Sequence, residues 1–129
     1  MPTHVKIIRP SDFLIATPTG QIDFENSKRL LMTVASATAT LDAHEILLDM
    51  RHARSELSAS DLWHLAAELS RCPDAFPGKI AVVCRHSGQA AFFALCAQNR
   101  GFPVNAFTSF EDAVEWFSAD GPGHLEPAV

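Results

Sequence analysis

The chain has 129 residues, of which 47% are apolar and 19% are charged, and its formal net charge is −5. This length and balance predict one folded domain with its own hydrophobic core, because a disordered chain has fewer apolar and more charged residues. The acidic balance argues against nucleic acid or an anionic membrane surface as the main partner.

The cysteines and the apolar runs predict the cellular location of the protein. Cys72, Cys84 and Cys96 share no CxxC spacing, which predicts reduced thiols in a cytoplasmic protein. The N-terminal residues contain no long apolar run, and the longest uninterrupted run anywhere covers residues 90–97. We therefore expect neither a signal peptide nor insertion into a membrane.

Two short strands are expected at the N-terminus. Residues 5–8 form the first, and the turn-forming cluster at residues 9–12 closes it. Residues 13–16 form the second, which Pro18 and Gly20 are expected to end. Together they predict an antiparallel hairpin.

Three apolar runs predict further strands, at residues 45–49, 79–84 and 104–107. The first two contain the unbroken segments Ile46-Leu47-Leu48 and Ile80-Ala81-Val82-Val83, which are typical of strands covered on both faces. Four helices alternate with the strands. Their expected starts are Asp23, Ser58, Ser87 and Ser109.

The order β-β-α-β-α-β-α-β-α predicts a single α/β domain. Its mixed sheet is expected to have four to five strands, with parallel core strands, the antiparallel hairpin at one edge, and four helices. The domain should cover residues 1–120. Residues 121–129, which include Gly121-Pro122-Gly123, should form a flexible tail.

Motifs spread over most of the chain carry a family resemblance. They are Gly20 before an acidic helix start, Leu47-Leu48-Asp49, Lys79-Ile80-Ala81-Val82-Val83, and Ala106-Phe107 followed by Phe110-Glu111-Asp112-Ala113-Val114-Glu115-Trp116-Phe117. With these motifs the chain resembles the SpoIIAA-like branch of the STAS/SEC14-type domains, small α/β modules related to bacterial anti-sigma-factor antagonists. The resemblance implies a non-enzymatic, regulatory module that binds a protein partner or a small ligand.

Ser58 has two interpretations. The antagonists of that family carry a phosphorylatable serine in an Asp-Ser-Ser/Thr-Gly turn, and the matching stretch here is Leu57-Ser58-Ala59-Ser60, without the Asp and the Gly. A phosphate at a helix start would meet free N–H groups. We favour the simpler interpretation, in which Ser58 caps the helix.

The loops that follow the two core strands are rich in basic residues. Ligands of open parallel sheets gather outside the carboxyl ends of the strands. These loops therefore predict an anion-accepting crevice, in which arginines supply charge and histidines a pH-dependent part of it. In the alternative, the arginines pair with surface acids such as Glu45 and Glu56. The candidate residues are Arg51, His52, Arg54, Ser58, Arg85, His86, Ser87 and Gly88.

Cys84 supports an alternative function as an enzyme. It ends a strand, precedes a helix and has Arg85 and His86 beside it, features that lower the pKa of a thiol. The segment also resembles the second half of a rhodanese, which implies sulfur transfer or other thiol chemistry on Cys84. Rhodanese loops, however, have the form Cys-x-x-x-x-Arg, and Gln89 stands where that arginine would be.

The third helix is apolar on every face, since it reads Gln-Ala-Ala-Phe-Phe-Ala-Leu-Cys-Ala-Gln from residue 89. Its phenylalanines, Phe92 and Phe93, are expected to be buried, to form the interface of a homodimer, or to line an apolar ligand cavity. The histidines and cysteines form no ligand set for a metal, and we expect no cofactor. The partner is expected to be a protein or a small anionic or apolar ligand.

Overall fold

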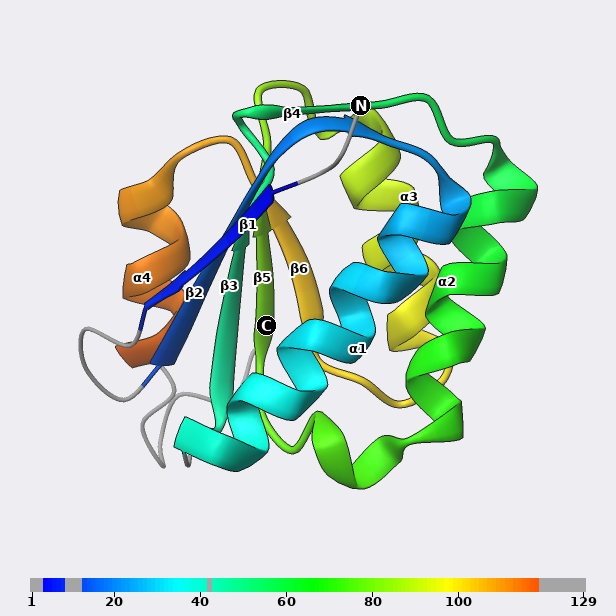
Figure 1. The fold of residues 1–129 in the computed structure, drawn as a ribbon. Helices are drawn as coiled ribbons and strands as arrows, with labels where there is room; N and C mark the ends of the chain where they lie inside the picture. The colour runs from blue at the N-terminus through cyan, green and yellow to red at the C-terminus, as the bar shows by residue number, and fades with distance from the viewer. Residues whose placement is uncertain (1–3, 9–12, 42, 119–129) are drawn as a thin grey trace.

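The computed structural model describes residues 4–8, 13–41 and 43–118 (Figure 1). The predicted turn at residues 9–12 and the predicted tail at residues 121–129 lie outside this part of the chain.

The described residues form six strands. They are β1 (His4–Ile8), β2 (Phe13–Ile22), β3 (Glu45–Asp49), β4 (Ala53–Ser55), β5 (Ile80–Val83) and β6 (Val104–Phe107). The main sheet has the order β1-β2-β3-β5-β6, and β4 pairs with the end of β2. β1 and β2 are antiparallel, whereas all other pairs are parallel, which confirms the predicted hairpin and the parallel core.

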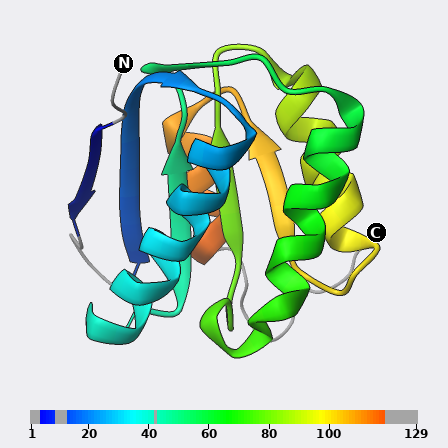
Figure 2. The same ribbon diagram turned by 45° about the vertical axis from the view of Figure 1, so that its right-hand side comes forward.

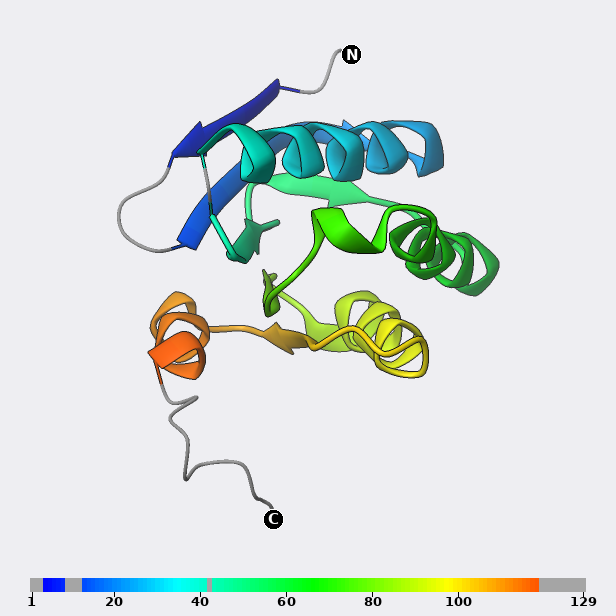
Figure 3. The ribbon, with the colours of Figure 1, turned by 90° about the horizontal axis from the view of Figure 1, so that it is seen from below.

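Helices cover both faces of this sheet. The helices are α1 (Phe24–Leu41), α2 (Ala59–Arg71), α3 (Ser87–Gln98) and α4 (Phe110–Ser118), and a short 3-10 helix, η1 (Pro73–Ala75), follows α2. α1, α2 and α3 pack on one face and α4 on the other (Figures 2 and 3). None of the described helices is long and apolar enough to cross a membrane.

The unbroken apolar runs of the core strands explain this double cover. Side chains alternate between the two faces of a strand. Leu48 and Val82 accordingly join the cluster under α1, α2 and α3, whereas Leu47 and Val83 join the cluster under α4. All four are buried, so every position of the run has an apolar partner. The fold class predicted from the sequence is therefore confirmed.

The prediction that β2 ends before Pro18 and Gly20 is wrong, because the strand continues to Ile22. Residues 13–16 pair with β3 and residues 20–22 pair with β4. Pro18 lies between these two parallel ladders, where its missing N–H interrupts neither of them. Gly20 has a φ of 95°, a backbone conformation that glycine adopts without strain.

β4 was not expected from the sequence. Its residues, Ala53-Arg54-Ser55, contain no apolar run, and the sequence pattern here is that of a loop. Pairing with the end of β2 makes them a strand. This pairing positions residues 53–58, which connect β3 to α2 and are called the strap below.

Candidate ligand-binding site

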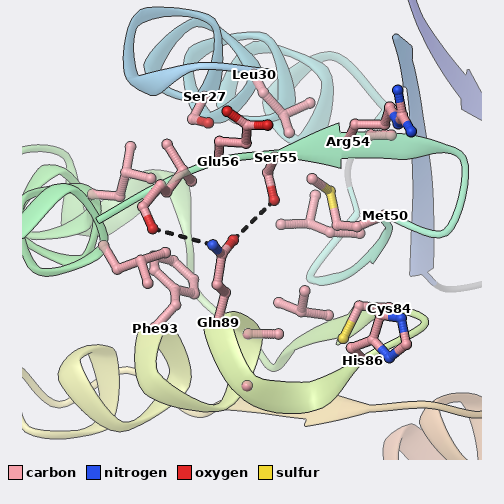
Figure 4. A pocket seen from close by; sticks show the side chains of 18 of the residues that line it. Ser27, Leu30, Met50, Arg54, Ser55, Glu56, Cys84, His86, Gln89 and Phe93 are labelled. Carbon is pink, nitrogen blue, oxygen red and sulfur yellow. Dashed lines mark hydrogen bonds between the residues drawn. The ribbon is translucent and has the colours of Figure 1, made fainter. Parts of the chain in front are cut away.

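A pocket of about 650 Å³ lies between the strap and the N-terminal turns of α2 and α3 (Figure 4). Leu48 and Met50 reach it from the end of β3, and Val82 and Cys84 from the end of β5. The pocket therefore lies at the carboxyl ends of the two core strands, where a ligand of an open parallel sheet is expected.

The inner wall of the pocket is apolar. α1, α2 and the two core strands all contribute aliphatic side chains to it, and most of these side chains are buried. Phe93 of α3 adds an aromatic ring. Such a wall offers contacts to an apolar ligand and leaves few hydrogen-bonding groups unsatisfied. The buried leucines and the valine among the lining residues are Leu30, Leu31, Leu48, Leu62, Leu65 and Val82.

The side chain of Gln89 joins α3 to the strap at the mouth of the pocket. Its Oε1 accepts a hydrogen bond of 3.0 Å from the hydroxyl of Ser55. Its Nε2 donates a hydrogen bond of 3.1 Å to the backbone carbonyl of Leu57. Figure 4 shows both bonds. Gln89 and Ser55 were not among the residues predicted from the sequence, although Gln89 is the polar residue directly before the apolar run of α3.

Arg51 does not line the pocket. Its Nε and Nη2 donate hydrogen bonds of 2.8 Å to the two carboxylate oxygens of Asp49. Its guanidinium also lies 5.5 Å from the centroid of the Phe110 ring, which packs on the α4 side of the sheet. Hydrogen bonds from Arg51 hold the pKa of Asp49 below its ordinary value of 3.8, and the same pairing raises the pKa of Arg51.

Arg54 borders the pocket but points away from its interior. Strand alternation in β4 directs Ser55 toward Gln89, and the guanidinium of Arg54 therefore extends from the opposite side of the strap (Figure 4). Arg85 also borders the pocket and is exposed. Neither arginine has an ion-pair partner within the residues that the structure describes. The three predicted arginines thus do not converge on one point.

Of the remaining residues predicted for the crevice, some border the pocket and others lie outside it. His86 and Gly88 border the pocket, whereas His52 is exposed in the turn after Asp49 and lies outside it. Ser87 is the first residue of α3. Of the eight residues predicted for this crevice, Arg54, Arg85, His86 and Gly88 lie around the pocket.

Ser58 is the N-cap of α2. Its hydroxyl accepts a hydrogen bond of 3.0 Å from the backbone N–H of Asp61. The carboxylate of Asp61 accepts one of 3.1 Å from the backbone N–H of Ser58. This is a complete capping box, and it confirms the interpretation of Ser58 as a helix cap. A phosphate on Ser58 would lie beside a carboxylate, which disfavours it.

Cys84 faces the pocket as a neutral thiol. Burial raises its pKa above the ordinary value, although a hydrogen bond with the backbone of His86 acts in the opposite direction. Its Sγ lies 3.7 Å from the carbonyl oxygen of Phe107. The expectation of a lowered pKa is therefore wrong, because desolvation by burial outweighs the hydrogen bond with the backbone of His86.

The two phenylalanines of α3 have different surroundings. Phe93 is 8% exposed and belongs to the core cluster under α1, α2 and α3. Phe92 is 38% exposed, and Leu95 on the same helix is 54% exposed. The structure thus assigns Phe93 to the pocket and leaves Phe92 on the surface. Among the described residues, no group of three His, Cys, Asp or Glu side chains is placed to hold a metal ion.

Comparison with known proteins gives a structural likeness. No protein-family model and no curated protein matches the chain. An anti-sigma factor antagonist from Mycobacterium paratuberculosis superposes with a TM-score of 0.59 at 16% identity, over 89% of this chain and 93% of that one. A protein of the DUF3478 family from Shewanella loihica PV-4, described as SpoIIAA-like, gives a TM-score of 0.54 at 21% identity, over 88% of this chain and 92% of that one.

A third solved structure is the unphosphorylated form of the anti-sigma factor antagonist SpoIIAA. It matches with a TM-score of 0.54 at 10% identity, over 92% of this chain and the whole of the other (100%). Each of the three superpositions covers most of this chain and most of the other protein's chain. The chain therefore has the SpoIIAA-like fold that its sequence motifs predicted.

Proposed function

We propose that the chain is a non-enzymatic binding module that holds a small apolar ligand in the pocket beneath the strap. The observation that carries this proposal is the pocket itself, with a volume of about 650 Å³ and an aliphatic inner wall. Sites for small ligands typically have volumes of roughly 300 to 1,000 Å³ and mostly apolar linings.

The distribution of charge supports an apolar ligand over a free anion. Arg51 is engaged by Asp49, and the guanidinium of Arg54 points away from the interior. The raised pKa of Cys84 supports a role in binding, because a protonated thiol is a poor nucleophile. An apolar molecule of the size of the pocket would bury its surface against Leu48, Val82 and their neighbours.

A protein partner is the second candidate. Two of the similar solved structures are described as anti-sigma factor antagonists, which favours regulation through protein binding. The exposed side chains of Phe92 and Leu95 would give such a partner an apolar contact. A homodimer through the same helix is one form of this candidate.

A dye titration with two matched variants tests the pocket. Ala90 lines the pocket, and its neighbour Ala91 on the same helix is exposed and does not. Ala90→Phe should fill part of the cavity, whereas Ala91→Phe adds the same ring outside it. The wild type and Ala91→Phe should bind the neutral dye N-phenylnaphthylamine with the same affinity. Ala90→Phe should bind the dye about tenfold more weakly, because the added ring would occupy space in the pocket and cover apolar wall that the dye would otherwise contact.

Equal binding by the wild type and Ala90→Phe would place the dye elsewhere and contradict the proposal. Failure of the wild type to bind would contradict it as well. Circular dichroism of both variants provides the control for folding, and both should retain the helical signal of the wild type.

A further inference from the structure

We propose that the pocket contains a subsite for a carboxamide group, which the side chain of Gln89 fills in this structure. The hydroxyl of Ser55 and the backbone carbonyl of Leu57 form the subsite. The inference rests on the proposed function, because it names the polar group carried by the apolar ligand of the same pocket.

The hydrogen bonds of Gln89 define what the subsite recognises. Ser55 donates a hydrogen bond to the amide oxygen at 3.0 Å, and the Leu57 carbonyl accepts one from the amide nitrogen at 3.1 Å. The strap thus presents one donor and one acceptor, spaced so that the two ends of a single planar carboxamide reach them. A carboxamide is a group that offers an acceptor and a donor on neighbouring atoms.

Other polar groups fit this pair less well. A carboxylate has only acceptors, so one of its oxygens would face the Leu57 carbonyl oxygen without a proton between them. An alcohol has a single oxygen with which to replace the two separate atoms of the amide. The subsite should therefore prefer an amide to a carboxylate or an alcohol with the same hydrocarbon chain.

Gln89 can leave the subsite at little cost. Its side chain is exposed, and it projects from the first turn of α3. A ligand amide that replaces it restores both bonds to the strap, and the released side chain is hydrated by water. The subsite and the apolar wall belong to one pocket, because Ser55 and Leu57 line it together with Met50, Ala90 and Phe93. An alkyl chain attached to the amide would extend along this wall.

Three ligands with one chain length test the preference, namely octanamide, octanol and octanoate. Their affinities for the wild type, Gln89→Ala and the double variant Gln89→Ala/Ser55→Ala can be measured by calorimetry. Gln89→Ala opens the subsite, and we expect it to bind octanamide about tenfold more tightly than octanol, since two hydrogen bonds are gained. The double variant should lose most of this preference. In the wild type, octanamide should shift the NMR signals of the Gln89 side-chain amide.

The outcomes separate this inference from the proposed function. Equal binding of octanamide and octanol to Gln89→Ala would overturn the carboxamide subsite and leave the apolar pocket intact. Tighter binding of octanoate would overturn it too. An amide preference that survives in the double variant would show that Ser55 takes no part. If none of the three ligands binds the wild type or Gln89→Ala, the proposed function itself fails.

Discussion

Asp49 is 5% exposed at the end of β3, and its carboxylate accepts two hydrogen bonds from the guanidinium of Arg51. A carboxylate whose pKa is lowered in the folded state stabilises the fold above its unfolded pKa, and this contribution is lost as the pH falls through the folded pKa. Because the guanidinium of Arg51 is bound to Asp49, Arg51 is not available to a ligand in the pocket. The pair also predicts how stability should respond to acid.

Asp49→Asn should lower the free energy of unfolding at neutral pH, because the charged pair is lost while the shape of the side chain is kept. The gap between the wild type and Asp49→Asn should be largest well above the ordinary pKa of 3.8, and it should narrow as the pH falls through that value toward the lowered pKa of the folded carboxyl. Urea unfolding at a series of pH values measures this gap. A gap that stays constant over this range would show that the ion pair contributes nothing.

Ser58→Ala should lower the free energy of unfolding by about 1 kcal/mol, because it removes the hydroxyl that caps α2. Ser58→Asn is the matched control. Asparagine is as good an N-cap as serine, so this variant should retain most of the wild-type stability. Urea unfolding of the three proteins provides the measurement. If the two variants lose the same amount, the cap is not the reason for the loss.

At the scale of single elements, β2 has the least regular backbone. It pairs with β3 before Pro18 and with β4 after it, and Gly20 with its φ of 95° lies where the second pairing begins. Any other residue would be strained at this position, because L-amino acids rarely adopt a positive φ of this size. Gly88, in the first turn of α3, has no such constraint, and an added Cβ there would meet nothing within 4 Å.

These two glycines form a matched pair. Gly20→Ala should lower the free energy of unfolding by about 1 to 2 kcal/mol, because alanine is strained at a positive φ. Gly88→Ala should leave the stability unchanged or raise it by up to about 1 kcal/mol, since alanine favours a helix. Thermal or urea unfolding compares them. A loss in Gly88→Ala equal to that in Gly20→Ala would contradict this account of β2.

The sequence predicted those elements whose signals are local. β3 and β6 have the bounds that their apolar runs indicated, and the caps Asp23 and Ser58 bind their helices as expected. β4 could not be predicted in this way. Its residues form a strand because they pair with β2, whose residues lie more than thirty positions earlier in the chain, and not because of their own composition.

The pocket lies at the edge of the sheet where the crevice was predicted, but its inner wall is apolar, whereas the predicted crevice was lined by basic residues. Topology placed the crevice at the carboxyl ends of β3 and β5. The directions of the arginine side chains could not be predicted. Arg51 binds Asp49, and Arg54 points away from the pocket because it lies on β4, a strand that the sequence does not predict. Gln89 gave one local signal, a polar residue before an apolar run, but its partners in the strap are set by tertiary packing.

At the scale of the whole molecule, α3 has both a buried and an exposed apolar face. Phe93→Ser should lower the free energy of unfolding by about 3 kcal/mol or more, because a buried aromatic ring is lost from the core. Phe92→Ser should leave the fold intact. If the exposed face of α3 mediates a homodimer, sedimentation should show a smaller mass for Phe92→Ser than for the wild type. An equal mass would exclude Phe92 from any such interface.

The proposed function depends on an apolar ligand that occupies the pocket between the strap and the sheet. An amide-resolved NMR titration of the wild type with octanol tests it most directly. We predict saturable shifts at Leu48, Val82 and Ala90, which line the pocket, and unchanged signals at Ala113 of α4, on the opposite face of the sheet. Shifts that are absent, do not saturate, or gather around the exposed Leu95 would contradict the claim.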